Sequence, residues 1–217
     1  PGTNRLVIDD RVLREGAVAL LCSDDVPLRA VVSQGCRPVG KPFTVTKSER
    51  NLVYELAGQP AMSRLQELVQ SVDDEERALM REGLHVGVVV DEHKFDFARG
   101  DFLIRNLLGA DQRSGALAIG ERVDVGTTVQ FQVRDADAAD DDLRALLTGV
   151  NGDAALLFTC NGRGTHLFPE PNHDAGTVEE LLGTVPLAGA FCAGEIGPIG
   201  GRNFLHGFTA SVVVFEH

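Results

Sequence analysis

A thiol, an amide and a guanidinium stand together just after an apolar run that predicts a strand over residues 154–160. The run ends in Cys160-Asn161-Gly162-Arg163-Gly164. Because ligand crevices of α/β folds open at the ends of strands, Arg163 is a candidate to clamp a carboxylate through two parallel hydrogen bonds. The alternative is structural: Cys160 is a small buried side chain, and Arg163 pairs with an aspartate of the core.

A second loop combines opposite charges. Residues 194–202 hold four glycines and one proline around Glu195, and Arg202 closes the loop. Successive backbone N–H groups in such a loop can form an anion nest beside Arg202, while Glu195 suits an ammonium group. An amino-acid ligand carries both charges, and Asn203 and His206 on the next predicted strand complete the candidate set. The alternative is an ion pair between Glu195 and Arg202.

A third candidate is the pair Cys36 and Arg37, which follows a strand predicted over 28–33. We expect the guanidinium to lower the pKa of the neighbouring thiol, which would make both residues part of a ligand site. The alternative is a tight turn before Pro38. Arg134 and Asp135 fit the end of a strand and the cap of the helix that follows.

Enzyme interpretations have little support in the sequence. The chain has no G-x-S-x-G, P-loop or H-E-x-x-H motif, and its six histidines lack the spacing of metal ligands. We therefore expect no catalytic residue, no metal site and no cofactor. One possibility stays open, a hydrolase or transferase in which Cys160, His206 and Glu195 meet as a triad.

The elements that position these residues follow from hydrophobic periodicity. Strands are expected at 17–22, 28–33, 43–46, 52–56, 84–90, 102–106, 127–133, 154–160, 187–192 and 204–215. Helices are expected from residues 61, 73 and 135 onward and over 177–182. This interleaving predicts an α/β, mixed α+β fold with mixed β-sheets flanked by helices in a layered sandwich.

The amino-acid composition limits the classes of partner that the protein can bind. The 217 residues carry 20 basic and 32 acidic side chains, a net charge of −12. This charge argues against a nucleic-acid-binding protein and against a basic protein that lies on a membrane surface. No apolar run approaches the ~20 residues that cross a bilayer, so we expect no membrane insertion. Four cysteines without a C-x-x-C pair indicate reduced thiols and a cytoplasmic protein.

Three blocks of sequence together resemble the FIST family, named for F-box and intracellular signal transduction proteins. They are Ser33-Gln34-Gly35-Cys36-Arg37-Pro38-Val39-Gly40, then 158–164, then 194–209, with further matches at 45–46, 55–60, 105–106 and 134–136. By this resemblance, residues 1–45 are the end of the N-terminal domain and 46–217 the C-terminal domain. A chain that starts with Pro then suggests an N-terminal portion that is missing or forms a separate chain.

The resemblance implies a cytoplasmic sensory module for signal transduction that binds a small molecule, with an amino acid as the favoured ligand. Eukaryotic relatives join the domain to an F-box, so the first alternative is a protein-interaction adaptor. The second is the cysteine-dependent hydrolase or transferase. On the leading hypothesis the ligand-binding residues are Cys160, Asn161, Arg163, Glu195, Arg202, Asn203, His206, Cys36 and Arg37.

Overall fold

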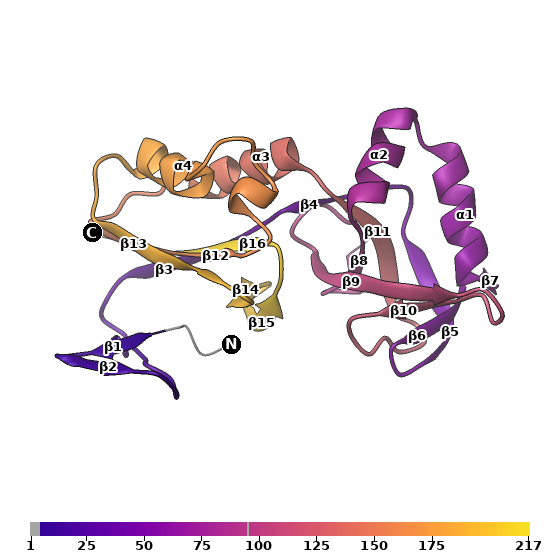
Figure 1. The fold of residues 1–217 in the computed structure, drawn as a ribbon, viewed down its shortest axis with the longest axis horizontal. Helices are drawn as coiled ribbons and strands as arrows, with labels where there is room; N and C mark the ends of the chain where they lie inside the picture. Colours follow the sequence, from indigo (N-terminus) through magenta and orange to yellow (C-terminus); the bar gives the residue numbers. More distant parts are fainter. Residues whose placement is uncertain (1–4, 95) are drawn as a thin grey trace.

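The protein forms two lobes that lie side by side, and the chain first passes from one lobe to the other between residues 34 and 36 (Figure 1). The computed structural model describes residues 5–94 and 96–217. Residues 1–4 of the expected N-terminal region 1–45 therefore lie outside the described residues. Strands and helices alternate in both lobes, and the mixed α+β class with layered sheets and flanking helices is confirmed.

The first lobe is a barrel. Its sheet runs in the order β10-β9-β8-β11-β5-β6-β7, and pairing of β6 with β10 closes it. The strands are β4 (Cys36–Pro38), β5 (Phe43–Glu49), β6 (Leu52–Leu56), β7 (Gln59–Pro60), β8 (Leu84–Val89), β9 (Phe102–Asp111), β10 (Ala116–Ile119) and β11 (Thr128–Arg134). Alternating apolar side chains point into the barrel, where Val45, Leu56, Leu117 and Val133 are almost fully buried.

Two helices cover the outside of the barrel, α1 (Ala61–Ser71) and α2 (Asp74–Glu82). The start of α2 follows from its acidic run, since the Asp73 carboxylate accepts a hydrogen bond from the Glu76 N–H at 2.9 Å. Acidic side chains in the first turn also complement the helix dipole. The predicted helix starts near residues 61 and 73 are confirmed.

The second lobe is a sandwich built on the sheet β13-β12-β16-β3. Its strands are β3 (Leu28–Gln34), β12 (Ala154–Cys160), β13 (Leu187–Cys192) and β16 (Thr209–Phe215). The helices α3 (Ala136–Leu147) and α4 (His173–Leu182) lie over one face (Figure 1). The unit β12-α4-β13 is a parallel crossover, which places the ends of both strands at the same edge as the start of α4.

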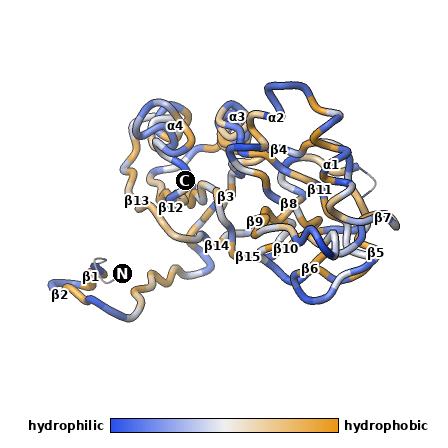
Figure 2. Tube along the Cα trace, turned by 45° about the vertical axis from the view of Figure 1, so that its right-hand side comes forward, coloured by the Kyte–Doolittle hydropathy of each residue, from blue (hydrophilic) through white to orange (hydrophobic). Residues whose placement is uncertain are grey.

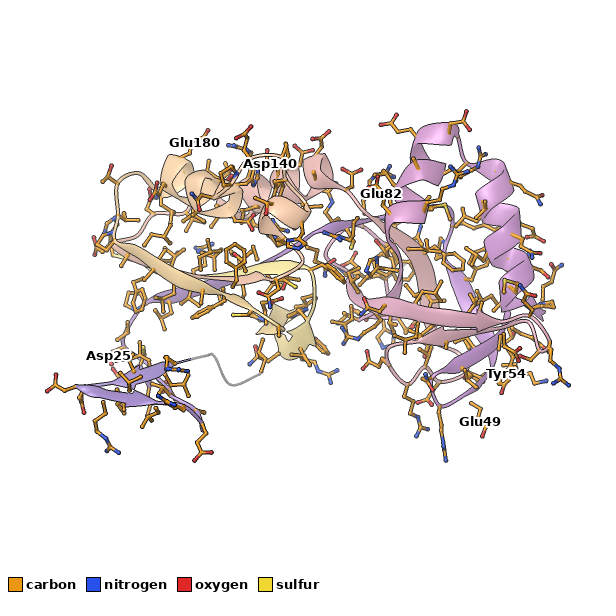
Figure 3. The ribbon with its side chains drawn as sticks, in the orientation of Figure 1. Asp25, Glu49, Tyr54, Glu82, Asp140 and Glu180 are labelled. Atoms are coloured by element: carbon orange, nitrogen blue, oxygen red, sulfur yellow. The ribbon has the colours of Figure 1, made fainter. Side chains whose placement is uncertain are left out.

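The helix layer is fastened by a cap and by charges. Asp135 caps α3 as expected by accepting a hydrogen bond from the Ala138 N–H at 3.0 Å. Arg144 then joins the two helices, because it contacts Asp140 of α3 at 2.8 Å and Glu180 of α4 at 3.0 Å. Figure 3 shows both carboxylates in the helix layer.

A hairpin of β14 (Glu195–Ile199) and β15 (Arg202–His206) lies against the opposite face of this sheet. A Cβ at Gly197 would come within 2.3 Å of a Val32 methyl, so glycine permits this close approach. The single strand predicted over 204–215 is wrong. The chain turns at Gly207 and Phe208, where Phe208 has a φ of 63°, and β15 and β16 belong to different sheets.

The strand predicted at 17–22 is also wrong. This stretch is irregular, and Leu20 and Leu21 are 74% and 96% exposed. Figure 2 shows it as an apolar connection between β2 (Arg11–Leu13) and β3. The preceding hairpin instead pairs β1 (Leu6–Ile8) with β2 (Arg11–Leu13). Residues 17–22 are apolar, as a buried strand requires, but no strand pairs with them among the described residues.

Gly35 and Phe208 are in contact where the lobes meet, and we call this contact the seam. It allows a prediction about the stability of the protein. A Cβ at Gly35 would lie 2.6 Å from the Phe208 carbonyl oxygen, which is backbone and cannot move aside, whereas nothing lies within 4 Å of a Cβ at Gly176 in α4. We expect Gly35→Ala to destabilise the protein by about 1–3 kcal/mol and Gly176→Ala to stabilise it by about 0.5–1 kcal/mol. Urea unfolding of both variants checks this. Equal effects would contradict a tight seam.

Candidate functional site

The sequence blocks that carry the family resemblance meet where the two lobes touch. The Gly35 N–H donates to the Phe208 carbonyl at 3.0 Å. Arg134, at the end of β11, donates to the Gly162 carbonyl at 2.5 Å, and its guanidinium lies 5.1 Å above the centre of the Phe208 ring. Residues far apart in the sequence thus form one junction.

Behind this junction, Arg163 is engaged inside the protein. It is 1% exposed, and its Nε and Nη2 donate to the two oxygens of Asp174 at 2.9 and 2.6 Å. The bidentate carboxylate contact expected for Arg163 therefore exists, but its partner is an aspartate in the first turn of α4. The structural alternative, an Arg163 paired to a core aspartate, is confirmed.

Glu195 is also buried, and it does not meet Arg202. The register of the hairpin pairs Glu195 with His206 and Ile199 with Arg202, so the two charges lie at opposite ends of the hairpin. Both the shared ligand clamp and the ion pair between them are therefore wrong. Glu195 instead accepts a hydrogen bond from the Thr209 hydroxyl at 2.9 Å.

Burial changes the acidity of Glu195. Desolvation raises the pKa of this carboxyl above its usual range, although hydrogen bonding to Thr209 and the nearby charge of Arg163 oppose the effect. One of its oxygens, Oε1, is buried without a hydrogen-bond partner among the described residues. Cys160 lies beside it, 8% exposed, and accepts a long contact from the Gly162 N–H at 3.4 Å.

The expectation of an acidic thiol at Cys36 is wrong. Cys36 is 1% exposed, and desolvation raises its pKa to about 12 even though Arg134 and Arg163 lie near enough to oppose the shift. The neighbouring Arg37 points elsewhere, contacting Asp135 at 2.6 Å and Glu76 at 2.9 Å. Both residues serve the packing between lobes in this structure.

A cleft of about 550 Å³ opens between the lobes, beside the junction. The barrel side contributes β9 and the loop after β10, with Arg105, Asn106 and Glu121; the other side contributes β15, with Asn203 and His206. Arg105 pairs with Glu121 and also donates to the Leu205 carbonyl at 3.2 Å across the cleft. Clefts between lobes that gather a few polar groups are common ligand sites.

His206 forms a buried wall of this cleft. Its Nε2 lies 2.9 Å from the Gly197 carbonyl oxygen, and burial, assisted by the charge of Arg105, lowers its pKa below the usual value. The ring is therefore neutral at pH 7, and Nε2 carries the proton donated to Gly197. Because Nε2 is engaged in this way and no hydrogen bond joins His206 to Cys160 in the described part of the chain, a Cys160-His206-Glu195 triad is not assembled.

The remaining predicted residues are exposed. Arg202 lines a second hollow of about 520 Å³ at the hairpin turn, where Asp91, Glu92 and Asp101 stand on the barrel side. Asn161 is exposed beyond the end of β12. Of the nine predicted ligand residues, the interlobe cleft therefore holds only Asn203 and His206 on its walls.

Sequence reasoning missed three residues that define the local chemistry: Glu121, Asp174 and His173. Glu121 follows β10 without any motif, and Asp174 lies 11 positions beyond its partner Arg163. One signal was available, since Gly200-Gly201 between two apolar runs indicates a two-residue hairpin turn. That signal would have placed Glu195 and Arg202 at opposite ends.

Neither residues 5–94 nor 96–217 contain a group of three or more His, Cys, Asp or Glu side chains arranged to hold a metal ion. No helix in the described part of the chain is long and apolar enough to cross a membrane.

Comparison with known protein families identifies the family of this chain. A model of the FIST N domain matches residues 2–59, and a model of the FIST C domain matches residues 61–198. Because these matches cover most of the chain, the protein belongs to the FIST family, whose domains are generally sensory domains of signal transduction and are not known as enzymes. The FIST N match lies within this chain, so a separate N-terminal chain has no support.

Mycobacterial proteins are similar over almost the whole chain. The uncharacterized protein Mb0898c of Mycobacterium bovis is 53% identical over 223 residues, covering 99% of this chain and 57% of its own length. The uncharacterized protein Rv0628c of Mycobacterium tuberculosis is 50% identical over 220 residues, with the same shares. The chain thus spans 57% of the length of these curated relatives.

The buried pair predicts a strong dependence of stability on both partners. Arg163→Met leaves Asp174 buried without its cation, and we expect a loss of about 3–5 kcal/mol. Combining Arg163→Met with Asp174→Leu removes both charges and should recover a large part of that loss. Urea unfolding of the wild type, each single variant and the double variant measures the coupling. Additive losses would contradict a direct pair.

Thiol reactivity tests the corrected view of Cys36. A pKa of about 12 instead of the usual 9.0 lowers the thiolate fraction about a thousandfold at a pH below both values. We therefore expect a limiting alkylating reagent to modify the partly exposed Cys22 and Cys192 well before Cys36. Peptide mass spectrometry gives the order. Labelling of Cys36 as fast as Cys22 would show that the seam opens readily.

Proposed function

We propose that the protein is a cytoplasmic sensory module that binds a small polar molecule, preferably an amino acid, in the cleft between its lobes. The observation that carries this proposal is the Arg105–Glu121 pair on the cleft wall, opposite Asn203 and His206. The cleft therefore presents a cation, an anion and an amide around one open hollow. Four unpaired cysteines agree with a reducing compartment.

An α-amino acid matches this wall because it also carries both charges. Its carboxylate takes the place of Glu121 on the Arg105 guanidinium, and its ammonium group takes the place of Arg105 on Glu121. The exchange keeps each charge paired, which limits the cost of removing the ligand from water. The Asn203 amide supplies a donor and an acceptor that sense the rest of the ligand.

Ligand binding at this site would also change a contact between the two lobes. Arg105 belongs to the barrel, yet it donates to the Leu205 carbonyl of the hairpin on the other lobe. A ligand that turns the guanidinium toward itself changes a contact between lobes. Differential affinity for two lobe positions is what a sensory domain requires in order to convert binding into a signal.

Thermal shift with the twenty amino acids tests the proposal. A true ligand at a hundred times its Kd should add about 2.7 kcal/mol of stability. Asn203→Ala should weaken binding about twofold to tenfold, because one neutral hydrogen bond is lost, without changing the stability of the free protein. Asn161→Ala is the matched control, since Asn161 is exposed and lies outside the cleft. No shift with any amino acid, or equal effects of both variants, would reject the site.

A further inference from the structure

Strand β13 is an open edge of the four-stranded sheet. Its residues Leu187–Cys192 pair with β12 on one side, in register from Ala155 opposite Leu187 to Cys160 opposite Cys192. On its other side no strand pairs with it among the described residues. The strand contains neither a proline nor a charged side chain, which are the usual devices that block addition of another strand.

The hydrogen bonds at its ends show which backbone groups are free. The Ala155 N–H donates to the Pro186 carbonyl at 2.9 Å, and the Asn161 N–H donates to the Cys192 carbonyl at 2.7 Å. In a parallel ladder, alternate residues of one strand face the partner, so residues 186, 188, 190 and 192 face β12. The N–H and C=O groups of Leu187, Gly189 and Phe191 are therefore directed away from the sheet, and this edge can accept a further strand.

A cavity of about 290 Å³ lies along this edge, between β13 and helix α4. Leu157, Leu187, Ala190 and Phe191 give it an apolar wall, and Gly189 lines it without a side chain. Phe191 is 61% exposed beside it. An edge strand and a helix with an apolar cavity between them form a groove of the kind that binds an extended peptide, with backbone bonds along the strand and one side chain in the cavity.

The charge of the groove selects the occupant. Helix α4 lines it with Glu179, which is exposed, and with Asp174, whose charge is already paired with Arg163. None of the lining residues is lysine or arginine, so Glu179 gives the groove its acidic character. The Nδ1 of His173, in the same lining, is buried without a hydrogen-bond partner among the described residues. A second copy of this chain would bring an identical acidic groove and a charge of −12, so repulsion opposes that pairing.

From these observations we propose that the groove between β13 and α4 binds an extended peptide segment of a partner protein, in which one apolar residue is flanked two positions away by lysine or arginine. The segment adds to β13 antiparallel, the better-paired orientation. Its apolar side chain opposite Gly189 enters the cavity, and a basic side chain on the same face meets Glu179. The groove is separate from the interlobe cleft, so this proposal does not rest on the sensory function.

The test uses a fluorescein-labelled peptide, Thr-Lys-Thr-Leu-Thr-Lys-Thr, and fluorescence anisotropy with the 217-residue chain. An antiparallel strand places the leucine N–H toward Gly189 and the adjacent threonine N–H groups away from β13. N-methylation of the leucine should therefore abolish binding, whereas N-methylation of an adjacent threonine, the matched control, should leave it unchanged. Replacing both lysines with glutamates should abolish binding as well.

Protein variants complete the design. Glu179→Lys should weaken binding of the lysine peptide about fivefold or more, because attraction becomes repulsion. Glu82→Lys is the control, an exposed glutamate of α2 on the other lobe (Figure 3). Four results would overturn the proposal: no saturable binding at millimolar peptide, equal binding of the two methylated peptides, equal effects of the two lysine variants, or a dimer of the chain that excludes the peptide.

Discussion

The arrangement of the lobes depends on the packing of Phe208 against Gly35 and Gly162. A Cβ at Gly162 would lie 2.7 Å from the Phe208 ring, and one at Gly35 would lie 2.6 Å from the Phe208 carbonyl oxygen. Phe208 also has a φ of 63°, a conformation that a bulky residue adopts only when its surroundings enforce it. The edge-to-face contact with His85 of β8, 4.5 Å between ring centres, fixes the ring from the barrel side. The interlobe cleft lies directly beside this contact, since Phe208 is one of its lining residues.

The buried polar side chains next to the contact between the lobes have a structural role. Arg163 and Asp174 tie the loop after β12 to the start of α4. His173 extends the network, since it stacks on Phe168 at 3.6 Å between ring centres and lies 3.2 Å from Asp140 of α3. A buried pair of this kind contributes little net stability compared with apolar side chains, yet it penalises any arrangement that separates its partners. In this structure the pair holds the first turn of α4, whose residues line the groove along β13.

The sequence predicts the features that depend only on residues close together in the chain, such as helix caps and strands. Asp135 is predicted as a helix cap because this short acidic side chain stands directly before an amphipathic run. The strands at 154–160 and 187–192 are predicted because each is a short continuous apolar run, although β13 proves to be mostly exposed. The partners that charged side chains meet in the fold are not predictable from the sequence. Arg163 needs a carboxylate, but which one it meets is decided by a crossover helix, and Arg202 is separated from Glu195 by hairpin register. The thiol of Cys36 shows the same limit: a neighbouring arginine argued for a low pKa, and burial, which depends on the whole fold, outweighed it.

The cleft and the groove are separate, but short stretches of the same chain line both of them. Phe191 of β13 lines the groove, and Ala193, two residues further, lines the cleft immediately before β14 begins. If the β14–β15 hairpin took a second position relative to the barrel, the end of β13 would be displaced through Ala193 and Gly194, and its in-register pairing with β12 would oppose movement along the strand. The backbone groups that β13 offers to an added strand would then differ between the two hairpin positions. A ligand in the cleft alters the affinity of the groove only to the extent that it binds the two hairpin positions differently, and the same coupling must then act in reverse, from an occupied groove to the cleft.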